Sequence, residues 1–235
     1  MSLDIRYNNQ LRVQNFDEND QLVLAKSRVL VIGAGGLGCP VLLQLAALGV
    51  GYLTLVDDDT IETHNLNRQT LYTPADTGKH KATIAAKRIQ EFNPGVTIHP
   101  VVDRLTSKNA EQYISGHDLV LDCTDNIPGR YVMDKVCKEH QVPMIFGGVR
   151  MLEGQYGVFN YKKSASFSDV FPKSQHFEQI EDCSTLGTFV FACHLIASYQ
   201  VNEAFKILLN REHVQAGKVV SINLETGSQI RVGGN

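Results

Sequence analysis

Residues 28–38 read Arg28-Val29-Leu30-Val31-Ile32-Gly33-Ala34-Gly35-Gly36-Leu37-Gly38. The first five form a short β-branched run that is typical of a buried parallel strand. Glycines then follow at the spacing Gly-x-Gly-x-x-Gly, and residues 40–48 carry apolar side chains at helical spacing. In such a loop the glycines permit a tight turn, the approach of a phosphate to the backbone, and close packing of helix on strand. We therefore expect residues 33–38, the phosphate loop, to bind a nucleotide at a helix N-terminus, through Gly33, Gly35, Gly36 and Gly38.

The rest of the chain alternates strand and helix patterns. Strands are expected at 52–56, 96–102, 119–123 and 144–146, and helices at 79–92, 107–114 and 129–140. This alternation predicts an α/β fold with a Rossmann-like, doubly wound, mostly parallel sheet. After Gly154 the pattern changes to an alternating strand at 155–161, a long apolar helix at 189–209 and a last strand at 219–224. We therefore expect antiparallel strands added in the C-terminal third.

The length of 235 residues fits a single domain. Its expected parts are an N-terminal helical segment (1–27), a nucleotide-binding core (28–160), a crossover loop (162–188), and a C-terminal helix and strand (189–235). The crossover loop is long and polar with scattered aromatic residues. Loops of that length inside a compact domain are usually functional or mobile.

Composition narrows the class of protein. The formal net charge is −3 and no basic run occurs, so nucleic acid is not an expected partner. The N-terminus has no signal-peptide pattern, and no apolar stretch reaches the roughly 18 residues of a membrane span. We therefore expect a cytoplasmic protein that does not contact a membrane.

The five cysteines are scattered and include no C-x-x-C pair. This spacing argues against a disulfide framework and against a four-thiolate zinc site. Most of the cysteines are expected to be small buried hydrophobic residues.

Charged and amide side chains follow the strand ends beyond the phosphate loop. Asp57 ends the strand 52–56 and is placed to accept a hydrogen bond from a ribose hydroxyl. Asp59 follows, then the stretch 65–69, which contains Arg68, and then Lys81. Two cations grouped with carboxylates and amides suit a triphosphate with Mg²⁺ better than they suit a nicotinamide ring. The sequence therefore favours ATP over NAD.

These motifs together resemble those of the MoeB/ThiF family, the bacterial relatives of ubiquitin-activating enzymes. The resemblance runs from about residue 6 to 160 and resumes at Cys183 and at 200–208. It rests on the phosphate loop and on the stretches 6–10, 48–51, 55–59, 65–69, 78–81, 118–126 with Arg130, and 153–155.

The family binds ATP·Mg²⁺ and adenylates the C-terminal carboxylate of a ubiquitin-like sulfur-carrier protein that ends in Gly-Gly. The resemblance implies phosphates at Gly36, a ribose at Asp57, Mg²⁺ at Asp125, and catalytic roles for Arg68 and Lys81. It implies further nucleotide contacts from Asp59, Asn65, Gln69 and Asn126. It also implies a homodimer in which the N-terminal segment reaches the partner's nucleotide site.

The sequence departs from the family pattern in three places. Asn9 stands where relatives carry an arginine that is thought to act on the phosphates across the dimer, and the candidates to replace it are Arg6 and Arg12. His64 replaces a serine, and we interpret it as a bystander. The two C-x-x-C pairs that hold a structural zinc in many relatives are missing, so we expect a variant without zinc.

Cys183 occupies the position of a family cysteine on the segment that crosses the active site. One interpretation is a catalytic thiol that captures the activated carrier or takes part in sulfur transfer. The other is a cysteine without a role, because sequence gives no evidence of a lowered thiol pKa.

Adenylation of a sulfur carrier for molybdenum cofactor or thiamine biosynthesis is the leading hypothesis. Activation of another carboxylate, in a peptide or a tRNA nucleoside, is a second enzyme hypothesis. A nucleotide-binding or carrier-binding homologue with weakened catalysis is a third, motivated by Asn9 and the missing zinc ligands. NAD-dependent redox chemistry ranks last.

Overall fold

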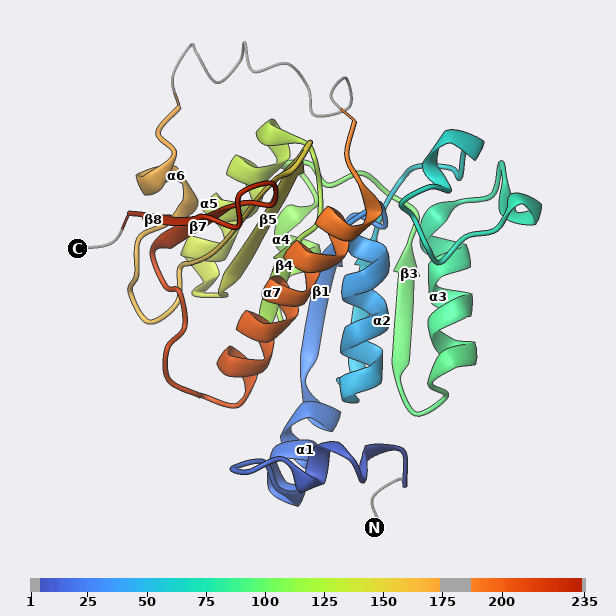
Figure 1. Ribbon diagram of the computed structural model, residues 1–235, viewed down its shortest axis with the longest axis horizontal. Coiled ribbons are helices and arrows are strands. Elements are labelled where there is room, and N and C mark those ends of the chain that lie inside the picture. Colours follow the sequence, from blue (N-terminus) through green and yellow to red (C-terminus); the bar gives the residue numbers. More distant parts are fainter. Residues whose placement is uncertain (1–4, 174–186, 234–235) are drawn as a thin grey trace.

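One mixed β-sheet forms the centre of the computed structural model, which describes residues 5–173 and 187–233 (Figure 1). Its strands are β1 (Arg28–Ile32), β2 (Tyr52–Val56), β3 (Thr97–Val101), β4 (Leu119–Asp122), β5 (Met144–Arg150), β6 (Glu153–Phe159), β7 (Lys218–Asn223) and β8 (Gln229–Val232). Their order is β3-β2-β1-β4-β5-β6-β7-β8. Strands β1 to β5 are parallel, and β6, β7 and β8 are antiparallel to their neighbours. The predicted Rossmann-like fold with an antiparallel C-terminal extension is confirmed.

Helices cover both faces of the sheet (Figure 1). On one face lie α2 (Gly38–Leu48), α3 (Lys81–Phe92) and α7 (Val190–Leu208), and on the other α4 (Ala110–Ile114), α5 (Ile127–His140) and α6 (Phe167–Val170). Each face of the sheet has its own hydrophobic core. Alternate residues of β1 pack into these two cores, because successive side chains of a strand point to opposite faces. Val29 and Val31 belong to the first core, and Leu30 and Ile32 to the second. The chain leaves β1 for one half of the sheet and enters the other half at β4, so the space beyond these two strand ends is the expected ligand site.

The C-terminal end of the sheet differs from the prediction. The sequence predicts 219–224 as the last strand, and this is wrong, because β8 pairs with β7 and forms the edge. All four residues of β8 are exposed, so the sequence there lacks the pattern of core-facing apolar residues that would predict a strand. A tight turn joins the two strands, in which Gly227, at φ +73°, donates its N–H to the Asn223 carbonyl at 2.8 Å.

The described first part of the crossover loop, residues 162–173, contains a short helix that the sequence does not predict. Ser166 caps α6 by accepting from the Asp169 N–H at 3.2 Å. Phe167 of this helix is buried and packs against the rings of Phe146 and Phe159. The first part of the crossover loop is therefore anchored to the sheet.

The N-terminal segment packs under the edge where the parallel strands begin (Figure 1). It contains α1 (Glu18–Lys26), with a capping box between Asp17 and Asp20, and two short turns, η1 (Ile5–Tyr7) and η2 (Gln10–Arg12). Gln10 and Gln21 both donate to the Leu48 carbonyl, at 3.1 and 3.0 Å. These contacts hold the segment against the C-terminal end of α2, away from the phosphate loop.

His117 gives the fold a specific pH dependence. Its Nε2 lies 2.8 Å from Thr54 Oγ1, and its Nδ1 is buried. Burial lowers the pKa of His117, so the unfolded chain takes up the proton first, near the ordinary value of about 6.5. The stability that the neutral ring contributes is therefore present above that value and is lost as the pH falls below it.

We expect His117→Gln to reduce the loss of unfolding free energy between pH 7.5 and pH 5.5, as measured by urea denaturation. Glutamine retains a hydrogen-bonding group for Thr54 but does not titrate. The control is His213→Gln, because the His213 side chain is 89% exposed. A His117→Gln protein with the same pH dependence as the wild type would contradict this assignment.

Candidate nucleotide site

The phosphate loop is fixed by close backbone contacts at the end of β1. The Gly33 N–H donates to the Val56 carbonyl at 2.9 Å, and Gly33 has a φ of +96°. A Cβ atom on Gly33 would lie 2.8 Å from the Cys123 carbonyl oxygen, and one on Gly38 would lie 2.0 Å from the Gly33 oxygen. Leu37 supplies no side-chain cap, the Cys39 N–H donates to the Gly35 carbonyl at 3.0 Å, and Pro40 has no N–H, so the N–H groups of residues 36–38 are the ones that could face a ligand.

Gly33→Ala tests whether the close approach of the Cys123 carbonyl, just after β4, shapes this loop. We expect it to destabilise the protein by about 1–3 kcal/mol more than Gly78→Ala does, because the added methyl group would displace the Cys123 carbonyl. Gly78 is a matched control, since its φ is also positive, at +84°, but no atom lies within 4 Å of its Cβ position. Urea denaturation measures the difference. Equal losses would show that only the positive φ matters, which costs about 1–2 kcal/mol.

Asp57, directly after β2, fixes the phosphate loop through hydrogen bonds to the backbone. Its carboxylate accepts from the Ala34 N–H at 2.7 Å and from the Asp59 N–H at 2.9 Å. Burial raises the pKa of Asp57, while the Ala34 hydrogen bond and the charge of Lys81 oppose the rise. The Tyr72 hydroxyl also donates to the Ala34 carbonyl, at 2.8 Å. Asp57 thus orders the loop, and its contact with a ribose stays a prediction.

The stretch 65–69, the Arg68 turn, lies against the phosphate loop. The carbonyl of buried Asn65 accepts from the N–H groups of Arg68 and Gln69, at 3.1 and 3.0 Å. Arg68 Cγ lies 3.6 Å from the Cβ position of Gly36, and Gln69 Nε2 lies 3.6 Å from that of Gly35. The sequence prediction that this turn accompanies the loop therefore agrees with the geometry.

Two side chains of the Arg68 turn have groups suited to a ligand. Among the described residues, the acceptors of the Arg68 guanidinium are local: the His64 carbonyl at 3.2 Å and Asn67 Oδ1 at 3.1 Å. Gln69 is buried, and its Oε1 has no hydrogen-bond partner within the described part of the chain. The His64 imidazole is exposed and pairs with Glu62 at 3.2 Å, in keeping with its interpretation as a bystander.

Lys81 supplies the second cation. It opens α3, and its Nζ lies 2.8 Å from Asp59 Oδ2. The lysine side chain is 7% exposed and the aspartate 66% exposed, so the ammonium is held in place by a carboxylate at the surface. Asp59 is thereby brought together with Lys81, as the sequence predicts for this cluster.

The predicted Mg²⁺ residue lies on the loop between β4 and α5, residues 123–126. Asp125 is exposed, and Asn126 caps α5 by accepting from the Gly129 N–H at 3.2 Å. Beneath the loop, Asp122 is fully buried and accepts from Arg130 Nε at 2.8 Å and from the Thr124 hydroxyl at 2.7 Å.

The buried pair has further contacts that anchor this loop. Burial raises the pKa of Asp122, and the charge of Arg130 opposes the rise. Arg130 also donates to the Thr124 and Gly147 carbonyls, at 2.5 and 3.2 Å, and its guanidinium stands 4.7 Å from the Phe146 ring centroid. Sequence reasoning placed Arg130 in a shared motif without seeing this structural role.

The described cysteines are buried and weakly acidic. They are Cys39, Cys123, Cys137 and Cys193. Burial raises the pKa of each thiol, to about 12 for Cys39, so each is a neutral group in this structure. The expectation of buried hydrophobic cysteines is confirmed for these four. Cys183, the candidate catalytic thiol, lies outside the described residues.

Cys193 is a site neighbour that sequence reasoning missed. It lies in the first turn of α7, and its Sγ would be 3.0 Å from a Cβ atom on Gly36. No local pattern could have shown this, because the two residues are far apart in the chain and their contact arises from the packing of α7 against α2.

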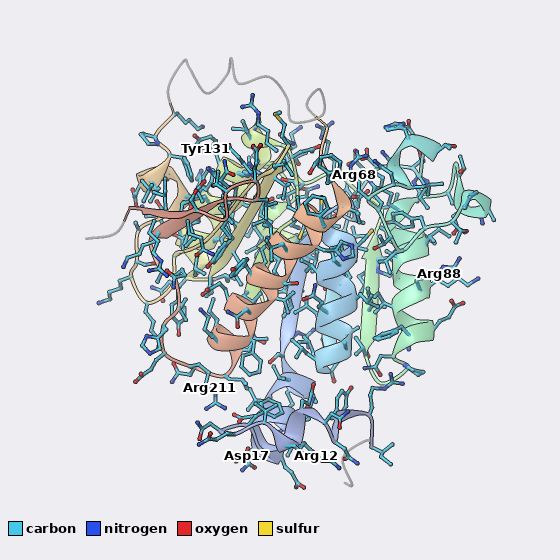
Figure 2. The ribbon with its side chains drawn as sticks, viewed as in Figure 1. Arg12, Asp17, Arg68, Arg88, Tyr131 and Arg211 are labelled. Atoms are coloured by element: carbon cyan, nitrogen blue, oxygen red, sulfur yellow. The ribbon has the colours of Figure 1, made fainter. Side chains whose placement is uncertain are left out.

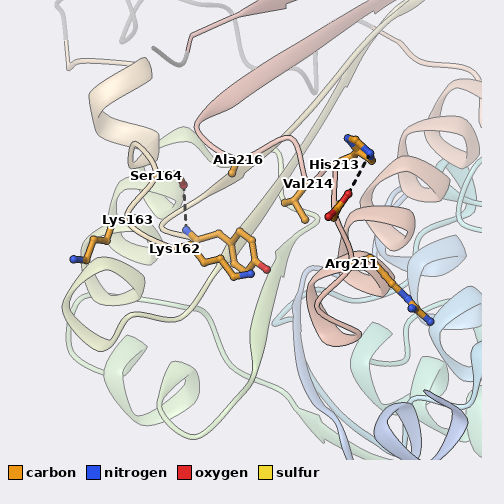
Figure 3. Close-up of a pocket in the computed structure, with 9 residues that line it drawn as sticks. Lys162, Lys163, Ser164, Arg211, His213, Val214 and Ala216 are labelled. Atoms are coloured by element: carbon orange, nitrogen blue, oxygen red, sulfur yellow. Dashed lines mark hydrogen bonds and ion pairs between the residues drawn. The ribbon is translucent and has the colours of Figure 1, made fainter. Parts of the chain in front are cut away.

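A separate hollow of about 440 Å³ lies beyond the end of β6, at the end of the sheet where the parallel strands begin (Figure 3). It is lined by Tyr161, Lys162, Lys163, Ser164, Arg211, Glu212, His213, Val214 and Ala216. Two of its cations have partners: Lys162 donates to Asn210 at 2.6 Å, and Arg211 pairs with Asp20 at 2.5 Å. The phosphate loop is the better candidate nucleotide site, because it precedes a helix N-terminus and lies against the Arg68 turn, where Gln69 Oε1 has no partner among the described residues.

In the ranges 5–173 and 187–233, no three His, Cys, Asp or Glu side chains gather as metal ligands. Within the same ranges, no helix has both the length and the apolar character needed to cross a bilayer.

Known proteins resemble this chain in sequence over most of its length. The ThiF family model matches residues 7–232. Molybdopterin-synthase adenylyltransferase of Salmonella typhimurium is 38% identical over 94% of the chain and 89% of its own length. Adenylyltransferase and sulfurtransferase MOCS3 of Drosophila sechellia is 37% identical over 92% of the chain. The chain spans about half the length of this and other MOCS3 relatives, with 48% of the Drosophila sechellia protein covered.

Solved structures resemble the fold at lower identity. E. coli MccB, crystallised with ATP, is 21% identical with a TM-score of 0.85, covering 97% of this chain and 71% of MccB. PaaA is 22% identical with a TM-score of 0.82, covering 97% of this chain and 72% of PaaA. Because the family model spans almost all of the chain and agrees with the sheet and the phosphate loop, this protein belongs to the ThiF family.

Proposed function

We propose that this protein adenylates the C-terminal glycine carboxylate of a ubiquitin-like sulfur-carrier protein, using ATP. The observation that carries the proposal is the convergence of the phosphate loop with Arg68 and Gln69 at Gly36 and Gly35. Relatives named molybdopterin-synthase adenylyltransferase and SAMP-activating enzyme E1, the latter 34% identical, support it. The first of these names favours molybdenum cofactor biosynthesis over thiamine biosynthesis.

The donor set fits ATP with Mg²⁺. Backbone N–H groups at the start of α2, the guanidinium of Arg68 and the ammonium of Lys81 are groups that bind phosphate oxygens. The Asp125 carboxylate is a hard oxygen ligand of the kind that Mg²⁺ takes. Bound Mg²⁺ would supply charge neutralisation on the phosphates, with Asp125 holding it and Asn126 beside it.

The proposed reaction needs no protein nucleophile. An oxygen of the carrier carboxylate forms a bond to the α-phosphorus, and the bond from that phosphorus to the bridging oxygen breaks, so that pyrophosphate leaves and an acyl-adenylate forms. Arg68 and Lys81 would neutralise the charge that develops on the phosphate oxygens. The phosphate loop would orient the nucleotide, because its backbone is already fixed by Asp57 and Tyr72.

A homodimer is part of this proposal. The N-terminal segment, with Arg12, lies at the end of the sheet opposite Arg68 (Figure 2). Within one chain, therefore, neither Arg6 nor Arg12 is placed to replace the arginine that Asn9 lacks. A contribution from this segment would have to come from a partner subunit, and sedimentation analysis would test the assembly.

ATP–pyrophosphate exchange tests the function. We expect exchange with a carrier protein ending in Gly-Gly, and none with the same carrier lacking its terminal glycine. Asp125→Asn should reduce exchange by about 10²-fold, since it removes the charge that would hold the metal. Exchange with short peptides but no carrier would favour the activation of another carboxylate. ATP binding without exchange for any carrier would favour a homologue with weakened catalysis.

A further inference from the structure

Three segments of the chain meet at Gly36. The phosphate loop supplies the glycine, the Arg68 turn supplies the methylene groups of Arg68, and α7 supplies the thiol of Cys193. Cys193 Sγ would lie 3.0 Å from a Cβ atom on Gly36, and Arg68 Cγ would lie 3.6 Å from the same point. Cys193 is only 2% exposed, so the contact is enclosed. The spacing between α7 and the phosphate loop is therefore set by a side chain with a single heavy atom beyond Cβ.

The same thiol contacts the end of the crossover loop. Thr188 Oγ1 lies 3.9 Å from Cys193 Sγ. Thr188 forms an isolated bridge with Met151, and the Met151 N–H donates to the Gly187 carbonyl at 3.2 Å. Cys193 thus stands between the phosphate loop and the residues that join the crossover loop to α7.

The chemistry of this position favours a steric role. Burial raises the pKa of Cys193, with Thr188 and the charge of Arg68 opposing the rise, so the group is a neutral thiol. The adjoining Gln69 amide offers a hydrogen-bond acceptor to a ligand at this position. It is 4% exposed, and its Oε1 has no partner in the part of the chain that the structure describes. A buried amide oxygen left without a partner is costly unless a ligand or water binds it.

We propose that Cys193 is a positioning residue for nucleotide binding. Its thiol holds the first turn of α7 at the distance from Gly36 at which the loop backbone and Arg68 can both face a triphosphate. The inference rests on the proposed function, because it takes ATP as the ligand of the loop. Cys193 acts through Gly36 and Arg68, and it takes no part in bond making or breaking.

Substitutions by size test the proposal. We expect Cys193→Leu to raise the Kd for ATP about tenfold or more, since the larger side chain must displace Gly36 or α7. Cys193→Ser, which keeps the size, should remain within about threefold of the wild type. The KM for the carrier should change little in either variant.

Cys137→Leu is the matched control. Cys137 is also fully buried on a helix, but it lies in the second core, on the α5 side of the sheet. We expect it to lower stability by a similar amount, in urea denaturation, without changing the Kd for ATP measured by calorimetry. This comparison separates a positioning role from general destabilisation.

Alkylation of the wild-type protein provides a second readout. Modification of Cys193 by N-ethylmaleimide requires the first turn of α7 to move away from the loop, so saturating ATP should slow labelling of Cys193 more than labelling of Cys137. Mass spectrometry of the two peptides measures both rates. Equal protection of the two cysteines, or a wild-type Kd in Cys193→Leu, would overturn the inference.

The outcomes for function and for positioning are distinguishable. A wild-type protein that binds ATP but shows no exchange with any carrier would overturn the proposed function and leave the binding role of Cys193 supported by its own variants. Normal exchange by the wild type, together with a wild-type Kd for ATP in Cys193→Leu, would support the proposed function and overturn the positioning role of Cys193. A wild-type protein that does not bind ATP would overturn both.

Discussion

Arg68→Ala should lower ATP–pyrophosphate exchange by about 10²–10³-fold, the effect of removing one donor that stabilises developing charge. The protein itself should remain nearly as stable as the wild type. In the described part of the chain, the Arg68 guanidinium donates to the His64 carbonyl and to Asn67 Oδ1, both in or next to its own turn. Its aliphatic part lies over Gly36, where it places the charge beside the phosphate loop.

Arg68→Lys and Arg88→Ala sharpen this prediction. Lysine restores the charge without the planar fork of guanidinium donors, so an intermediate rate is expected. Arg88, on the outer part of α3, pairs with Asp76 at 3.1 Å and lies away from the phosphate loop (Figure 2). Its replacement should leave exchange unchanged. Exchange near the wild-type rate in Arg68→Ala would remove this residue from the proposed site.

The second large effect is expected from Arg130→Ala. It should lower the free energy of unfolding by about 3–5 kcal/mol, because it leaves the buried carboxylate of Asp122 without a counter-charge. Arg130 also donates to the Thr124 and Gly147 carbonyls, and both would lose a partner. Exchange should fall as well, since the loop that carries Asp125 would lose its anchor.

Urea denaturation at several pH values measures this effect and identifies its cause. The difference in unfolding free energy between the wild type and Arg130→Ala should shrink as the pH falls and Asp122 takes up a proton. The reason is that a neutral carboxyl group is less costly to bury. The exposed pair on the same helix, Lys135 and Glu139 at 3.9 Å, provides the control. Lys135→Ala should change stability by at most about 1 kcal/mol. A similarly small change in Arg130→Ala would show that the buried pair is dispensable.

The parallel part of the fold could be predicted from sequence because its signals are local. Strands β1 and β4 are short apolar runs that are almost entirely buried, and α2 ends at Gly49, which adopts a φ of +83°. Strand β8 could not be predicted in this way. Its four residues are all exposed, and its place at the sheet edge depends on hydrogen bonds to β7 rather than on burial.

The same distinction applies to the site. The phosphate loop and the Arg68 turn were recognisable because their residues stand at fixed spacings within short motifs. The contact of Cys193 with Gly36 and the close approach of Gly33 to the Cys123 carbonyl are products of tertiary packing. Residues 174–186, which include Cys183, lie outside the described ranges, so a role for that thiol stays a prediction.

The contact between Gly33 and the Cys123 carbonyl also bears on how the site forms during folding. The two residues are brought together only when β4 pairs with β1, as in the register of Ile32 with Asp122. Pairing over such a sequence separation is slow relative to local helix formation. A growing chain that ends before β4 would carry the whole glycine motif but would lack the backbone that shapes it. Nucleotide affinity should therefore emerge late, with long-range strand pairing, and ATP could not assist the folding of the first half of the chain.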